Sequence, residues 1–331
     1  MRSETIDTDR TADTEAIETI DDRVAIVGCG RVGATSAYAL MLRGVARELV
    51  LVDLDRGLAE GEAMDLQHAV PMGRPVRIWA GDYRDAARAA IVVIAAGVSS
   101  RPGESRLELI GRNVVVVRAC MKQLLAAGFK GIVLMTTNPV DVLAQVAQEE
   151  SGLPVARVIG SGTVLDTARL RAMLGEELGV EARSVHAYIV GEHGDSEIAA
   201  WSSAQIAGLG VRAYREGEGP DLDALLGRVR TAAPEIIKHK GYTSYAIASC
   251  VTRICEAILR DEHSVLPVST MLTGQHGIDG VYLSLPCVVG RGGVARVIAL
   301  PLDAAELAGL RASAEVLRRT LASVRPAGAE V

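Results

Sequence analysis

The sequence predicts an α/β protein in which a doubly wound parallel sheet is followed by a mixed α+β domain. Three observations support this prediction. Short apolar segments alternate with helix-length amphipathic segments through roughly the first 150 residues, a glycine-rich turn joins the first such pair, and the order of elements changes afterwards. The chain of 331 residues is also long enough for two domains of ordinary size.

The first half of the chain reads as strands buried on both sides. Continuous apolar runs, rather than alternating ones, are typical of a parallel sheet that helices cover on both faces. We expect strands at Val24–Val27, Glu48–Asp53, Val76–Ala80, Ile91–Ala95 and Gly131–Met135, and helices at Ala34–Arg43, Gly57–His68 and Leu107–Ala127.

The order of expected helices and strands changes in the second half, which predicts the mixed α+β domain. Its expected helices are Val164–Leu178, Leu222–Lys238, Thr243–Leu259 and Asp303–Leu321, the last with Asp303 as its N-cap. Its expected strands are Ser184–Val190, Glu197–Ser203, Val265–Met271, Val281–Val289 and Ala295–Ala299. We therefore divide the chain into residues 1–22, 23–150 and 151–331.

Residues 1–22 are predicted to form a flexible acidic arm. They hold eight acids against two bases, and the rest of the chain is balanced at 33 acids against 33 bases. This segment lacks the apolar stretch of a signal peptide. The rest of the chain has no excess of basic residues that would attract nucleic acid, so we expect no nucleic-acid partner.

Composition narrows the class further. Hydrophobic residues make up 49% of the chain, yet no apolar run is long enough to span a bilayer, so we expect no membrane partner. The five cysteines include no C-x-x-C pair, so their pattern indicates neither a set of disulfides nor a zinc site. We expect reduced thiols, no metal and a cytoplasmic location.

The segment Gly28–Gly33 reads GCGRVG, a G-x-G-x-x-G that follows a strand and opens a helix. Glycines there permit a tight turn and let the backbone approach a pyrophosphate at the helix N-terminus. Asp53 ends the next strand, twenty residues after Gly33. A carboxylate there can accept the ribose hydroxyls and repels a 2′-phosphate, so the two signals together predict a Rossmann domain that binds NAD.

Several further segments carry a family resemblance. They are Ala95–Gly97, Pro102–Arg106, Thr136–Asp141, Gly160–Arg169, Gly191–Asp195 and Lys240–Thr243. In this order they resemble the L-lactate/malate dehydrogenase family, and more closely its bacterial L-lactate branch, from about Arg23 to Leu321. The resemblance implies an NAD-binding Rossmann domain, a substrate-binding catalytic domain, and reversible hydride transfer between NADH and pyruvate. It also implies a cytoplasmic homotetramer.

The resemblance assigns the catalytic residues one by one. His193 aligns with the family's acid/base histidine and Asp166 with the carboxylate that holds it. Arg169, three residues further along a predicted helix, would grip the substrate carboxylate in a bidentate manner. Arg106 on the family's closing loop would polarise the carbonyl, and Asn138 would donate to the same oxygen. Thr243 would line the substrate side. The cofactor-binding residues would be Gly28, Gly30, Val32, Gly33, Asp53, Gly97, Asn138, Ser161 and Ile247.

Ser100 departs from the family pattern. Lactate enzymes usually have Gln at this position and malate enzymes usually have Arg. The residue expected to contact the substrate's side chain and select the substrate therefore matches neither pattern. Glu104 favours the lactate branch, because an acid on the loop would repel a second substrate carboxylate. The small Ser100 predicts a pocket that tolerates keto acids somewhat larger than pyruvate. A malate or branched-chain 2-hydroxy-acid dehydrogenase stays open, as does a non-catalytic NAD-binding protein.

Arg171 and His186 match the basic residues of the family's effector site. A two-fold axis would bring two copies of each together, and fructose-1,6-bisphosphate would neutralise the resulting cationic cluster. In the alternative interpretation Arg171 pairs with Glu176 or with solvent, and His186 is a buried strand residue.

Overall fold

The computed structural model describes residues 20–99, 101, 103–214 and 220–325. Ser100 and residues 1–19, most of the expected arm, lie outside the described residues. The first strand, β1 (Ile20–Val27), begins within the last three residues of that expected arm. Its start is earlier than the apolar run Val24–Val27 indicates, because the backbone pairing of the strand extends back to Ile20, which pairs with Ala89.

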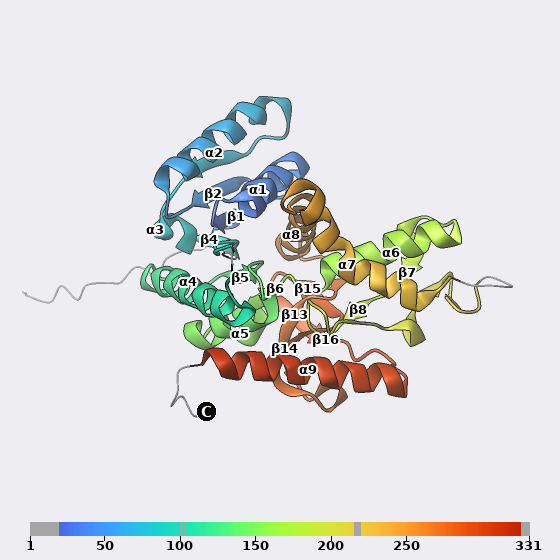
Figure 1. Ribbon diagram of the computed structural model, residues 1–331. Helices are drawn as coiled ribbons and strands as arrows, with labels where there is room; N and C mark the ends of the chain where they lie inside the picture. Colours follow the sequence, from blue (N-terminus) through green and yellow to red (C-terminus); the bar gives the residue numbers. More distant parts are fainter. Residues whose placement is uncertain (1–19, 100, 102, 215–219, 326–331) are drawn as a thin grey trace, which may run out of the picture.

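A single eight-stranded sheet forms the centre of the molecule (Figure 1). Six strands are parallel and lie in the order β3-β2-β1-β4-β5-β6. Besides β1 they are β2 (Glu48–Val52), β3 (Arg77–Ala80), β4 (Ala89–Ile94), β5 (Ile132–Met135) and β6 (Val158–Gly160). The order reverses beside β1, which is the arrangement of a doubly wound dinucleotide-binding sheet.

Helices cover both faces of the sheet, as the continuous apolar strands predict (Figure 1). Val24 and Ile26 pack in one apolar cluster, whereas Ala25 and Val27 of the same strand pack in another. The first cluster receives α1 (Arg31–Arg43), α2 (Arg56–Ala69) and α8 (Tyr245–Leu259). The second receives α3 (Tyr83–Ala87), α4 (Arg106–Ala126), α5 (Val140–Ser151) and α9 (Ala304–Val324).

Helix α5, strand β6 and the extension of the sheet beyond β6 were not expected from the sequence. Every residue of α5 from Val140 to Ala147 is buried, including the polar Asp141 and Gln145. The expected strands Ser184–Val190 and Val281–Val289 are each divided in two. The expected strand Val265–Met271 is divided at Pro267 into β12 (Ser264–Leu266) and β13 (Ser269–Thr273). Strand β13 pairs antiparallel with β6, and β14 (Asp279–Ser284) pairs with β13. The central sheet therefore continues into the second half of the chain.

The rest of the second half forms a smaller unit with its own core. Helices α6 (Val164–Leu178) and α7 (Leu222–Lys240) contribute Leu170, Leu174, Leu225 and Val229 to this core. The short strands of the unit are β7 (Val185–His186), β8 (Ile189–Val190), β9 (Ile198–Ala199), β10 (Gln205–Ile206) and β11 (Leu209–Gly210). Strand β12 pairs instead with β15 (Cys287–Gly290), which pairs with β16 (Gly293–Val297).

The expected strand Glu197–Ser203 is wrong beyond its first residues. Strand β9 is followed by a 3₁₀ turn, Trp201–Ser203, and Ser202 N donates to the Glu306 carboxylate on α9. The Glu306 side chain therefore accepts the backbone hydrogen bond that a neighbouring strand would otherwise accept. Other 3₁₀ turns are Val70–Met72, Val155–Arg157, Ala182–Ser184 and Gln275–Gly277. Among the described residues, no helix combines the length and apolar character that a bilayer crossing needs.

Candidate active site

The turn Gly28–Gly33 joins β1 to α1 and needs its glycines for different reasons. A Cβ on Gly28 would lie 2.3 Å from Ala96 N, and one on Gly33 would lie 1.9 Å from Gly28 O. A Cβ on Gly30 would meet nothing within 4 Å, so this residue faces open space. Gly30 is also the N-cap of α1 and makes no side-chain cap bond. The first amides of α1 are therefore available to an anion, and a pyrophosphate fits there.

Asp53 stands beside this turn. Its Oδ2 accepts a hydrogen bond of 2.6 Å from Cys29 N, and its Oδ1 accepts one of 2.9 Å from Asp55 N. Two backbone donors thus fix the carboxylate at the carboxyl end of β2, the place where a ribose reaches the sheet in this fold. The glycine turn and Asp53 together fit an adenine dinucleotide.

The other expected cofactor residues lie around the same end of the sheet. Val32 is in the first turn of α1, and Gly97 follows β4, where a Cβ would meet Thr137 Cγ2 at 2.5 Å. Ser161 is buried directly after β6, and Ile247 lies in the first turns of α8. The structure places these residues without testing their contacts to a cofactor, so their roles stay predictions.

A cavity of about 280 Å³ opens between the two units. Its lining includes five of the expected catalytic residues, which come from four separate parts of the chain: Arg106, Asn138, Asp166, Arg169 and His193. Thr243 lies in the turn between α7 and α8 and is not among the lining residues.

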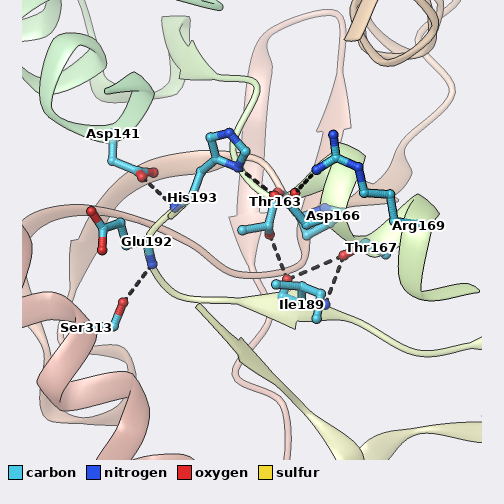
Figure 2. Close-up of polar contacts among 10 residues, drawn as sticks. Asp141, Thr163, Asp166, Thr167, Arg169, Ile189, Glu192, His193 and Ser313 are labelled. Atoms are coloured by element: carbon cyan, nitrogen blue, oxygen red, sulfur yellow. Dashed lines mark hydrogen bonds and ion pairs between the residues drawn. The ribbon is translucent and has the colours of Figure 1, made fainter. Parts of the chain in front are cut away.

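Asp166 connects His193 to Arg169 (Figure 2). His193 Nδ1 lies 2.6 Å from Asp166 Oδ2, and Arg169 Nη1 donates to Asp166 Oδ1 at 2.8 Å. An ionised carboxylate can only accept, so this contact places a proton on Nδ1 and leaves Nε2 to exchange a proton with substrate. The spacing of three residues on α6 puts Asp166 and Arg169 on one face, as predicted.

The backbone around His193 is held from three directions (Figure 2). Asp141, at the start of α5, accepts a bond of 2.8 Å from His193 N. Ser313 on α9 accepts from Glu192 N at 2.8 Å. Thr163 Oγ1 donates to Ile189 O at 2.7 Å, which ties the start of α6 to the strand leading to His193. These contacts fix the separation between Asp166 and His193 before substrate arrives.

The electrostatics favour a charged imidazole. Burial by itself would lower the pKa of His193, but the Asp166 carboxylate and its hydrogen bond, followed by the charges of Asp141 and Glu197, raise this pKa to about 9. Burial raises the pKa of Asp141 to about 6, although the hydrogen bond from His193 N opposes that shift. At neutral pH the His193 imidazole is therefore protonated and can donate a proton.

Arg106 begins α4, whose N-cap Ser105 forms a capping box with Glu108. Its side chain is 64% exposed and reaches Glu192 Oε1 at 3.4 Å and Asp195 Oδ2 at 3.7 Å. Nearby Glu104 pairs with Arg112 at 3.0 Å and does not line the cavity. The Glu104 carboxylate is thus paired in this conformation, and its expected repulsion of a second substrate carboxylate stays a prediction.

Sequence reasoning missed Glu197 and Arg230, which also line the cavity. Glu197 is 2% exposed and lies just before β9, and Arg230 comes from α7 and donates to Glu197 O. The available signal was an acid at the edge of the apolar segment Ile198–Trp201. An acid in such a place is seldom buried without a function or a partner.

The expected effector residues lie on the outer side of the smaller unit. His186 on β7 is exposed, which excludes the alternative of a buried strand residue. Arg171 Nε donates to Ala187 O at 2.9 Å, and its guanidinium lies 4.9 Å from the centre of the Tyr188 ring. Arg171 therefore contacts the strand segment next to His186 rather than Glu176.

Comparisons with known proteins agree with this geometry. Residues 22–160 match the family model of the lactate/malate dehydrogenase NAD-binding domain, and residues 163–326 match that of the α/β C-terminal domain. The L-lactate dehydrogenase of Priestia megaterium is 46% identical over 302 residues, covering 90% of this chain and 95% of that protein. That of Thermoanaerobacter pseudethanolicus is 46% identical over 305 residues, covering 91% and 98%.

Solved structures give the same result. The minor L-lactate dehydrogenase of Enterococcus mundtii, in a ligand-bound form, superposes with a TM-score of 0.90 at 43% identity, covering 92% of this chain and 98% of that one. A lactate dehydrogenase from a Medee basin deep-sea metagenome library gives a TM-score of 0.89 at 44% identity, with the same coverage. The expected fold class and the expected NAD-binding domain are confirmed.

Proposed function

This chain belongs to the lactate/malate dehydrogenase family, and on that premise we propose that it is an L-lactate dehydrogenase that interconverts pyruvate and L-lactate. The observation that carries the proposal is the convergence of Arg106, Asn138, Asp166, Arg169 and His193 on one cavity. A protein that kept only the cofactor fold would have no need of all five together.

Bound NADH would supply the hydride, and the residues of the chain do the rest. The Arg169 guanidinium, fixed at one edge by Asp166, offers its remaining donors to the substrate carboxylate. Arg106 and Asn138 donate to the carbonyl oxygen, where negative charge develops during reduction. For this step Arg106 must exchange Glu192 and Asp195 for the substrate, which fits its exposed position at the start of α4.

His193 completes the reaction by moving a proton at Nε2. As an imidazolium it gives that proton to the developing alkoxide, and Asp166 stabilises the charged form beforehand. In the reverse direction the neutral imidazole takes the proton from the lactate hydroxyl. We expect His193→Ala to abolish turnover while NADH binding, followed by its fluorescence, is retained. Surviving turnover would contradict the assigned role.

The relatives are the basis for proposing pyruvate as the preferred substrate, because Ser100 is neither the Gln of lactate enzymes nor the Arg of malate enzymes. The small side chain supports tolerance of 2-ketobutyrate beside pyruvate. Initial rates of NADH oxidation with pyruvate, 2-ketobutyrate and oxaloacetate would give three values of kcat/KM. We expect pyruvate and 2-ketobutyrate within about tenfold of each other, and a preference for oxaloacetate would favour malate as the natural product.

Regulation and assembly are part of the same proposal. We infer a cytoplasmic homotetramer in which fructose-1,6-bisphosphate binds Arg171 and His186 from two subunits. The exposure of His186 and its proximity to the Arg171–Ala187 contact support this inference. The bisphosphate should lower the apparent KM for pyruvate and increase the mass measured by light scattering. An unchanged KM in wild type, equal to that of Arg171→Gln, would rule the effector site out.

A further inference from the structure

Glu197 is a buried carboxyl group for which the mechanism above has no use. It is 2% exposed, and its Oε1 has no hydrogen-bond partner among the described residues. The side chain nevertheless lines the catalytic cavity. A buried carboxyl oxygen without a partner is costly, so its retention at the reaction centre needs an explanation.

The surroundings of Glu197 are dominated by the acid–base pair. One side-chain oxygen of Glu197, one of Asp166 and a ring nitrogen of His193 all lie within 4.8 Å of one another. Helix α6 also contributes Arg169, and α7 contributes Arg230, whose guanidinium bonds Glu197 O and whose charge also acts on the carboxyl group. The other charged groups facing His193 are Asp141 on α5, Glu192 and Asp195 beside it, and Arg106 on α4.

We propose that Glu197 is a positioning residue for proton transfer: its carboxylate is a second negative neighbour that keeps the proton on His193. This inference rests on the proposed acid–base role of His193. The short contact with Asp166 fixes the ring, whereas the unpartnered Oε1 of Glu197 gives that side chain no such hold, so Glu197 acts through its charge. Removal of that charge therefore affects the proton more than the geometry.

The direction of the effect follows from the charges. Burial, and then the charge of Asp166, raise the pKa of the Glu197 carboxyl above its usual range. As the pH rises, Glu197 loses its proton, and the negative charge that it acquires holds the proton on the imidazole. The carboxyl group thus extends the pH range in which His193 can protonate the alkoxide.

The test is Glu197→Gln, which keeps the shape and removes the charge. We expect the pKa of the His193 imidazole, measured by NMR in the cofactor-free protein, to fall by about one pH unit. The alkaline limb of kcat/KM for pyruvate should move down equally, so reduction above that limb falls about tenfold. The acid limb for lactate oxidation should also move down, so oxidation at low pH increases. A variant that was merely damaged would lose both directions together.

Two further variants keep the test decisive. Glu197→Asp retains the charge and should retain a limb close to that of wild type. Glu256→Gln on α8 removes another buried carboxylate, which pairs with Arg43 and Arg260, and should leave both limbs unchanged. An unchanged imidazole pKa in Glu197→Gln would overturn the inference about Glu197. Turnover in His193→Ala would instead overturn the proposed function, while the NMR titration would still report on Glu197.

Discussion

The Asp166 carboxylate lies 2.6 Å from Nδ1 of His193, although 27 positions separate the two residues in the chain. The contact exists because α6 and β8 are joined by hydrogen bonds through Thr163 and Thr167. It determines both the orientation of the ring and its protonation.

Asp166→Asn should leave the fold intact and weaken the acid. The amide keeps a polar group beside Nδ1 but removes the charge that raises the pKa of His193. We expect kcat for pyruvate reduction to fall about 10²-fold and its alkaline limb to move to lower pH. Stopped-flow measurement of the hydride step across pH checks this, and a variant with unchanged limbs would show that Asp166 only holds the ring in place.

Arg169→Lys tests whether Arg169 binds the substrate carboxylate through two parallel hydrogen bonds. Lysine keeps the positive charge but loses the planar pair of donors, and it loses the 2.8 Å bond to Asp166. We expect the KM for pyruvate to rise about 10²-fold with little change in the affinity for NADH. The matched control is Arg230→Lys, at the wall of the same cavity. An equal effect in the control would mean that the charge of the cavity matters rather than the fork of Arg169.

Asp53→Ala should weaken and broaden cofactor binding. The change removes an acceptor for the ribose and the partner of Cys29 N. We expect the KM for NADH to rise about tenfold and the preference over NADPH to shrink, with kcat nearly unchanged. Asp53→Asn keeps an acceptor for Cys29 N and serves as the control. Unchanged discrimination against NADPH in both variants would assign that selectivity to another residue.

Stability should fall as the pH rises from about 6.5 to 9. The folded protein raises the pKa of His193 from 6.5 to about 9, so this contribution is complete below 6.5 and lost by 9. The loss should amount to at most about 3 kcal/mol. Urea unfolding of the cofactor-free protein at several pH values measures it. His193→Gln should flatten the curve, and an equally steep curve in that variant would contradict the assignment.

Local sequence signals predicted the elements with local causes. The apolar runs of the first half predicted β1 to β5, and Asp303 caps α9 through Glu306 N as expected. The glycine turn and Asp53 predicted the dinucleotide site because strand, turn and helix are contiguous there. The catalytic residues required the family resemblance, since no periodicity relates Asp166 to His193.

The features that were missed depend on tertiary contacts. Helix α5 is enclosed by α4, α9 and the sheet, so its polar residues Asp141 and Gln145 are buried instead of facing solvent. Strand β13 joins β6 across more than a hundred residues. Glu197 and Arg230 face the cavity only because α7 packs against α6, which no spacing in the sequence indicates.

The pairing of β6 with β13 has a mechanical consequence. Strand β13 meets β6 at one residue pair, Ser269 with Gly160, and Gly191 forms a bridge with Ser284 of β14. Backbone pairing therefore continues from the parallel sheet to the residues just before His193. We expect this pairing to limit hinge motion between the two halves of the chain. Closure over a bound keto acid would then involve the edge of the cavity, where Arg106 lies. The hydride and the proton would be delivered from parts that one sheet connects.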